Sequence, residues 1–324
     1  MAKRHLPHVV VAADWSVDEK KRWMVRAELG SNKRYLVFSP EPVGEISALI
    51  ARIERCLPKE GTALLGFDFP IGLPRSYAEK VGLSAWRQAL RLFGSSDWNH
   101  FYELSDRPSL RQPFFPLSKQ KSGKLKTQLA ETLGYRNLDE LLRRCDKKTQ
   151  SRPKAECLFF TLGVKQVGAG TIVGWRDVLA PAMDMIRFWP FDGDLNNLLC
   201  EPGIAVAEIY PGEAYTHLDI SIGAGTGLSK RRREDRRKAC EHLLETVTSD
   251  CIKFSEAAKS WIQWGFEHED DFDAMVGLLS MFQVVTGEPG SGLPADDPAV
   301  RTIEGWILGQ QSSHLFESLP KGEP

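Results

Sequence analysis

The sequence predicts an α/β fold: a mixed sheet of three antiparallel strands followed by parallel strands, flanked by helices and interrupted by a mostly helical insertion. Residues 1–74 contain apolar runs of strand and helix length in the order β-β-β-α-β. An apolar run at 203–211 and a helical pattern from about residue 270 continue this alternation. Residues 75–200 are rich in Trp, Phe, Pro and basic side chains, which indicates an insertion.

The first 74 residues supply most of the predicted sheet. "HVVVAAD" is a β-branched run that ends in Asp14, and "RWMVRAEL" and "RYLVF" follow it after short polar connections, so the three runs predict an antiparallel meander. "EISALIARIERCL" has apolar residues at helical spacing and is stopped by Pro58. "TALLGFDF" is almost entirely apolar, as expected for a strand covered on both faces.

The remaining elements define the predicted domain boundaries. Within the insertion, "NLDELLRRC" and "VGWRDVLAPAMDMIRFW" predict helices. After the strand "GIAVAEIYP", the segment "SKRRREDRRKACEHLLETV" predicts a basic helix, and "DDFDAMVGLLSMFQVV" predicts a helix with an acidic start. We therefore expect residues 1–74 and 201–310 to form one domain, 75–200 an insertion, and 311–324 a frayed tail.

Composition excludes several classes of protein. The 324 residues are 42% hydrophobic and 26% charged with a formal net charge of −1, a globular composition without a global bias toward nucleic acid. Six scattered cysteines without a C-x-x-C pair favour reduced thiols over a disulfide framework or a zinc site. No apolar run is long enough for a membrane span or a signal peptide, so we expect a soluble, cytoplasmic protein without a membrane partner.

Carboxylates recur where the predicted elements meet. Three apolar strands end in Asp14, Asp68 and Glu208, and the last long helix opens with Asp270, Asp271 and Asp273. Residues three apart on a helix share a face, so Asp270 and Asp273 point together, and Ala274 and Gly277 continue this stripe with side chains small enough for close approach to a sheet. Ordinary helix capping and turn formation are the alternative explanations for these acids.

Gathered carboxylates repel one another, and a hard divalent cation relieves that repulsion. Mg²⁺ binds oxygen ligands and keeps several waters, so two ions held by about four carboxylates form a site for phosphodiester hydrolysis. The acidic pattern therefore indicates a site for Mg²⁺ or Mn²⁺.

The order of elements and acids resembles the ribonuclease H-like fold. Four segments, "DFPIGLP", "EIYPGEAY", "SKRRREDRR" and "DDFDA", resemble a domain-of-unknown-function family described as predicted ribonuclease H-like nucleases, related to RuvC-type Holliday-junction resolvases. The resemblance covers both ends of the chain and leaves about residues 75–200 unexplained. The first-strand Asp is often followed by glycine in that family, whereas Trp15 follows Asp14 here.

The resemblance implies roles for the acids. By analogy with the resolvases, Asp14, Asp68, Asp270 and Asp273 are the implied metal ligands and catalytic carboxylates. Glu208 is an implied neighbour, either an outer ligand or a hydrogen-bond acceptor behind the ligands. Asp271 lies about 100° round the helix from Asp270 and is the less favoured ligand, although a shift of the helix start by one residue exchanges the two.

The basic segment after residue 228 is the predicted nucleic-acid contact. Its phosphate-binding candidates share one side of the predicted helix or precede it: Lys230, Arg232, Arg233, Arg236 and Arg237. The alternative is a solvated face on which Glu234 and Asp235 pair with these cations. DNA or RNA is thus the expected partner, and a homodimer is the default for a resolvase-like fold.

Three functions remain open from the sequence. The first is a metal-dependent nuclease that hydrolyses phosphodiester bonds with two metal ions. The second is a nucleotide-dependent phosphotransferase of the actin or sugar-kinase type, for which "VGAGT" at 167–171 and "IGAGTG" at 222–227 are glycine-rich enough to cradle phosphates. The third is a non-catalytic module on the same fold that binds nucleic acid or protein.

Overall fold

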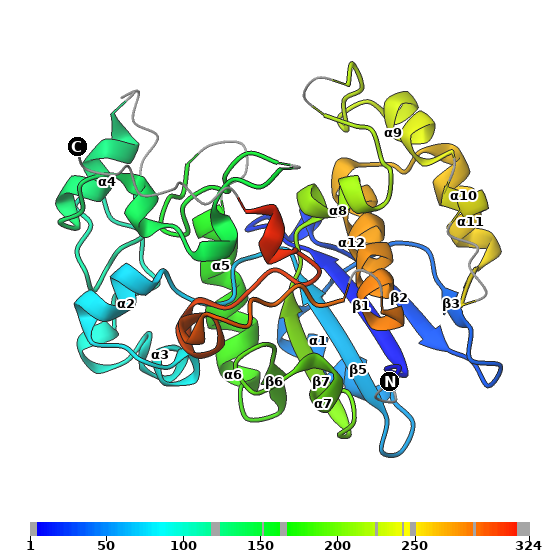
Figure 1. The fold of residues 1–324 in the computed structure, drawn as a ribbon, viewed down its shortest axis with the longest axis horizontal. Helices are drawn as coiled ribbons and strands as arrows, with labels where there is room; N and C mark the ends of the chain where they lie inside the picture. The colour runs from blue at the N-terminus through cyan, green and yellow to red at the C-terminus, as the bar shows by residue number, and fades with distance from the viewer. Residues whose placement is uncertain are drawn as a thin grey trace.

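A mixed sheet forms the centre of the computed structural model (Figure 1). The structure describes residues 5–117, 124–150, 152–162, 167–223, 226–241, 243–246, 251–287 and 290–315. In these residues the sheet has eight strands, with β4 paired to β2 beside the main order β6-β7-β5-β1-β2-β3-β8. The strands are β1 (Val9–Asp14), β2 (Trp23–Leu29), β3 (Tyr35–Val37), β4 (Glu41–Pro42), β5 (Thr62–Phe67), β6 (Ile186–Phe188), β7 (Gly203–Glu208) and β8 (Ile252–Phe254).

The strand directions confirm the predicted mixed sheet. β1, β2 and β3 are antiparallel neighbours, whereas β5 runs parallel to β1, and β7 parallel to β5. Two further strands extend the edges, because β6 pairs with β7 and β8 with β3, both in parallel. Parallel neighbours bring the carboxyl ends of β1, β5 and β7 to one edge of the sheet.

Two predicted helices of the insertion are wrong in part. The run "VGWRDVLAPAMDMIRFW" is helical only to Ala182, and its last residues form strand β6, where Ile186 and Phe188 are buried. The segment "NLDELLRRC" forms two short 3₁₀ turns, Leu138–Leu141 and Arg144–Asp146, instead of one helix. In both places, long-range contacts outweigh the helical periodicity of the sequence, because β6 pairs with β7 and Arg143 forms a buried ion pair.

One face of the sheet, called here the α12 side, is covered by the last long helix. This helix, α12 (Glu269–Thr286), is confirmed as predicted and lies across β1 and β2 beside α8 (Pro211–His217) (Figure 1). A Cβ added at Gly277 would lie 3.4 Å from the Cβ of Ala12 and 2.8 Å from Cδ1 of Ile209. The predicted close approach of α12 to the sheet through small residues is therefore confirmed.

Further helices pack beyond α12. α9 (Arg233–Cys240) and α11 (Glu256–Trp264) contact each other, and α10 (Leu243–Thr246) contacts α11. α9 begins three residues after Lys230, so the start of the predicted basic helix is a turn, in which the N–H of Arg232 donates to the carbonyl of Ser229 at 2.9 Å. The predicted tail lies outside the described residues from 316 onward.

The other face, called here the insertion side, shares a hydrophobic core with residues 75–200. Alternate residues of β1 and β5, including Val11 and Leu65, belong to one buried cluster with Trp86 and Trp175. α1 (Leu49–Arg55) also packs there. The helices of the insertion are α2 (Arg75–Val81), α3 (Trp86–Leu92), α4 (Leu125–Thr132), α5 (Val167–Gly174), α6 (Ala180–Ala182) and α7 (Leu195–Leu198).

All six cysteines are free thiols, as predicted. Within the described ranges, no helix combines the length and the apolar character needed to cross a membrane.

The loop after β5 is held by three backbone contacts. The carbonyl of Pro70 accepts a hydrogen bond from Nε1 of Trp175 at 2.7 Å, and the N–H of Leu73 donates to the carbonyl of Ile303 at 2.8 Å. The N–H of Ile71 donates to Glu208 at 2.7 Å. The "DFPIGLP" segment is thus a fixed link between the sheet, the insertion and the C-terminal segment.

Gly72 allows this loop to pass close to the C-terminal segment. Its φ is +129°, and a Cβ there would overlap the carbonyl oxygen of Glu304. We expect Gly72→Ala to lower the free energy of unfolding by more than about 3 kcal/mol, because backbone strain and overlap add together. Gly82→Ala is the matched control, since Gly82 has φ +76° with open space around it, and we expect a loss of about 1 kcal/mol. Equal losses in urea unfolding would contradict this explanation.

Candidate functional site

Asp14 and Asp68 lie side by side at the carboxyl edge of the sheet. Parallel pairing places Ala13 opposite Phe67, and the N–H of Asp68 donates to the carbonyl of Ala13 at 3.0 Å, which extends the ladder by one residue. Side chains alternate between faces along a strand, so both acids point to the α12 side, as Ala12 and Leu64 do. The register of one strand pair thus brings two predicted site residues together.

Two acids from the first turns of α12 complete a carboxylate cluster, defined as Asp14, Asp68, Asp270 and Asp273. The pKa of Asp14 is raised well above its usual value, first by burial and then by the negative charges of Asp273, Asp68 and Asp270. Burial also raises the pKa of Asp270 to about 6, together with Glu269 and Asp273. The structure therefore brings all four predicted ligands into one electrostatic neighbourhood.

Access to this cluster is uneven. Asp14 and Asp273 are 7% and 6% exposed, whereas Asp68 and Asp270 are half-buried. The cluster therefore opens to solvent on the side of Asp68 and Asp270.

Asp271 has a different position from Asp270. It is fully buried, and its Oδ2 accepts hydrogen bonds from the N–H groups of Glu267 and His268 at 3.2 and 2.9 Å. This carboxylate caps the start of α12, as helix N-termini favour. The structure thus places Asp270 in the cluster and gives Asp271 the capping role.

Two further side chains contact Asp273. The hydroxyl of Tyr215 on α8 donates to its Oδ1, and the ammonium of Lys230 donates to its Oδ2. Burial raises the pKa of Tyr215, and Asp273 raises it further. Burial by itself lowers the pKa of Lys230, but Asp273 and Asp14 outweigh it and the pKa is raised overall.

Sequence reasoning missed Tyr215 as a site residue and assigned Lys230 to nucleic-acid binding. Tyr215 lies within the "EIYPGEAY" segment, which was the available signal. Nothing in the sequence separates Lys230 from the arginines that follow it, because only the fold directs its side chain inward.

Glu208 is not a neighbour of the cluster, and this prediction is corrected. Glu208 pairs with Phe67 in the sheet, so it points to the insertion side, whereas Asp14 and Asp68 point to the α12 side. An offset of one residue between strand ends places a side chain on the opposite face. The sequence shows that three strands end in acids. It does not show the strand register, which places one of these acids on the opposite face of the sheet.

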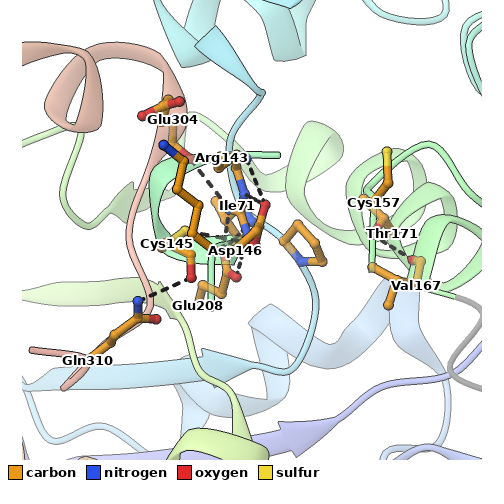
Figure 2. Close-up of polar contacts among 12 residues, drawn as sticks. Ile71, Arg143, Cys145, Asp146, Cys157, Val167, Thr171, Glu208, Glu304 and Gln310 are labelled. Carbon is orange, nitrogen blue, oxygen red and sulfur yellow. Dashed lines mark hydrogen bonds and ion pairs between the residues drawn. The ribbon is translucent and has the colours of Figure 1, made fainter. Parts of the chain in front are cut away.

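Glu208 instead forms a buried ion pair with Arg143 (Figure 2). The guanidinium donates to both oxygens of Glu208 at 2.6 and 2.7 Å and to Asp146 at 2.9 and 3.0 Å. Burial raises the pKa of Glu208, and Arg143 opposes this effect. Because Glu208 also accepts from the N–H of Ile71, it holds the loop that follows Asp68.

A compact set of potential ligands surrounds this arginine. Among the described residues, the group of three whose ligand atoms all lie within 4.8 Å of one another is Cys145, Asp146 and Glu208; the carboxylate cluster is less compact. Arg143 already supplies a positive charge there, and Arg143, Asp146 and Glu208 are 0%, 3% and 4% exposed. Burial also raises the pKa of the Cys145 thiol, which disfavours the thiolate that binds metal. This closed group is structural.

The predicted basic face divides into inward and outward residues. Arg236 is 2% exposed and donates to the carbonyls of Gly265, Phe266 and Glu267 at 3.0–3.2 Å, so its predicted phosphate contact is corrected. Buried carbonyls at a chain turn need donors, and Arg236 supplies them.

The other arginines of this segment remain toward solvent. Arg232 pairs with Asp235, and Arg237 pairs with Glu234 and Glu241, as the solvated-face alternative expects. Arg233 is exposed and lies 5.1 Å from the ring centre of Trp264, which is 63% exposed.

Packing requires Gly168 in the "VGAGT" segment, whereas Gly170 has room for a Cβ. This segment forms the start of α5, where a Cβ at Gly168 would lie 2.7 Å from the carbonyl oxygen of Leu158. At Gly174, the end of the helix, a Cβ would lie 2.4–2.8 Å from the ring of Phe69. In "IGAGTG", residues 224 and 225 lie outside the described residues.

We expect Arg143→Met to lower the free energy of unfolding by about 3–5 kcal/mol, because it leaves Asp146 and Glu208 buried without their cation. Denaturant unfolding measures this change. The matched control is Arg91→Met, which removes an exposed pair with Asp184 and should have little effect. Similar stability of the two variants would contradict a structural role for Arg143.

We expect Asp14→Asn to stabilise the protein in the presence of a chelator by about 0.5–2 kcal/mol at neutral pH. The raised pKa of Asp14 means that its ionisation opposes folding. The contribution of Asp14 to the stability of the wild type is complete below about pH 3.9, the usual Asp pKa. This contribution is lost as the pH rises through the pKa of Asp14 in the folded state. The advantage of the variant should therefore grow from pH 4 to pH 8 in thermal unfolding, and a constant or reversed difference would refute the argument.

Compared with known proteins, the chain matches no protein-family model, no curated protein and no solved structure.

Proposed function

We propose that the carboxylate cluster binds Mg²⁺ or Mn²⁺ and that the protein hydrolyses phosphodiester bonds of DNA or RNA. The observation that carries this proposal is the convergence of Asp14, Asp68, Asp270 and Asp273 on one face at the carboxyl edge of the sheet. Ligands bind at such edges in α/β proteins because the strand ends and following loops meet there. Crowded carboxylates with a raised pKa are typical of functional sites.

The donor set fits a hard divalent cation. Every side chain of the cluster offers carboxylate oxygen, which suits Mg²⁺ or Mn²⁺ better than softer metals. Asp68 and Asp270 are half-buried and leave access from solvent, unlike the closed group around Arg143. Lys230 already places a positive charge beside the cluster, as expected where several carboxylates favour a nearby cation.

The topology supports assignment to the ribonuclease H-like fold. Three antiparallel strands, β1 to β3, are followed by β5 and β7 in parallel on the other side of β1. α12 delivers its acids to the end of β1, as the resemblance implies. The sequence segments "DFPIGLP" and "DDFDA" lie at this edge and at this helix start.

Distinct residues carry out distinct tasks in the proposed reaction. A bound divalent ion lowers the pKa of coordinated water and neutralises charge on the phosphate. Asp14, Asp68 and Asp270 would hold it, while the hydroxyl of Tyr215 orients Asp273. Glu208 acts from the other face by holding the backbone that follows Asp68.

Nucleic acid would approach over the exposed end of the basic segment. Arg231, Arg232 and Arg233 are exposed and follow directly after Lys230 in the chain. Arg233 together with Trp264 offers a cation and an aromatic face, the combination that binds phosphates and stacked bases.

A non-catalytic binding module is the second candidate function. The observation that favours it is the contact of Lys230 and Tyr215 with Asp273, which partly satisfies the acids without metal. The packing role of Gly168 and the helical conformation of the segment in α5 weaken the phosphotransferase alternative, because a phosphate-binding loop needs its glycines for the ligand.

Asp68→Asn tests the nuclease proposal. We expect Mn²⁺-dependent cleavage of a mixed set of single-stranded, duplex and branched DNA and RNA to fall on the order of 100-fold or more, because a charged ligand is lost. The matched control is Asp184→Asn, at a carboxylate 79% exposed on the insertion, which should keep full activity. Cleavage unchanged in Asp68→Asn, or absent in the wild type with every substrate, would favour the binding module.

A further inference from the structure

Lys230 is built into the carboxylate cluster by its backbone. The N–H of Ser229 donates to Asp235 at 2.9 Å, and the carbonyl of Lys230 accepts from the guanidinium of Arg236. Asp235 and Arg236 are 7% and 2% exposed. Arg236 also binds the carbonyl of Gly265, close to the start of α12. The chain is therefore fixed on both sides of the lysine.

The ammonium group of Lys230 lies among the acids of α12. It donates to Oδ2 of Asp273 and lies 3.9 Å from Oε2 of Glu269, and its charge also acts on Asp14. Its side chain is 42% exposed, so the ammonium lies at the boundary between the cluster and solvent. This is the position of a cation that faces an incoming phosphate on one side and carboxylates on the other.

Asp273 has both oxygens engaged by protein donors. Tyr215 donates to Oδ1 and Lys230 donates to Oδ2. A second metal ion bound by Asp273 would compete with these donors for its two oxygens and would bring its charge next to the ammonium. Asp14, Asp68 and Asp270 with water molecules are sufficient for one octahedral ion.

We propose that the carboxylate cluster binds a single divalent ion and that the ammonium of Lys230 takes the place of the second. The inference rests on the proposed function and changes the two-metal expectation from the sequence. Lys230 then neutralises Asp273 and offers its remaining N–H donors to a non-bridging phosphate oxygen of the substrate. It is a positioning charge and exchanges no proton or bond in this role.

Counting bound Mn²⁺ on the full chain tests this inference. Electron paramagnetic resonance of free Mn²⁺ during titration at pH 7 should give one ion per wild-type chain. Lys230→Met should bind two, because Asp273 is released from its cation, and its first ion should bind at least about 10-fold more tightly, because a nearby positive charge is removed. Lys238→Met is the matched control on exposed α9 surface and should bind one ion with wild-type affinity.

The outcomes separate this inference from the proposed function. Two ions per wild-type chain would overturn the role of Lys230 and leave the metal site in place, and this result needs no variant to fold. One ion of unchanged affinity in a folded Lys230→Met would overturn it as well. No bound Mn²⁺ in the wild type would refute both the inference and the metal site, whereas the cleavage assay on Asp68→Asn is independent of the count.

Discussion

The parallel pairing of β1 with β5 is the constraint on which the candidate site depends. It places Asp14 and Asp68 next to each other, and the close packing of α12 at Gly277 brings further acids over the same edge. Burial, and then repulsion by the neighbouring acids, raise the pKa of Asp14, so its ionisation opposes folding. The rest of the site is arranged to compensate for that repulsion, through the ammonium of Lys230 and the hydroxyl of Tyr215.

The acids on the two faces of the sheet differ in their burial and in their ion pairs. On the insertion side, Glu208 is fully enclosed with Arg143 and serves to join the sheet, the insertion and the loop after Asp68 (Figure 2). On the α12 side, the carboxylate cluster keeps half-buried members and has Lys230 at its border. Breaking a closed, paired acid destabilises a fold, whereas acids that remain open to solvent can be reached by a ligand.

The basic segment before and within α9 combines both uses. Arg236 and Asp235 turn inward and hold the backbone around Lys230, while Arg233 remains at the surface beside Trp264. A segment whose sequence predicts a uniformly positive face therefore also positions the ammonium group of Lys230. Charge patterning gives the sign of a surface, but the direction of each long side chain depends on the carbonyls and acids that it meets in the fold.

The sequence by itself determined the mixed sheet and the extent of α12, because apolar periodicity and helical spacing are local properties. The four acids of the carboxylate cluster were implied by the resemblance to the ribonuclease H-like fold. The sequence did not determine strand β6, the two 3₁₀ turns on either side of Arg143, or the face to which Glu208 points. Those features depend on strand register and on long-range ion pairs, which single-sequence periodicity does not encode. Only the tertiary structure decided that Glu208 belongs to Arg143 and that Lys230 belongs to Asp273, since each pair joins segments distant in the chain.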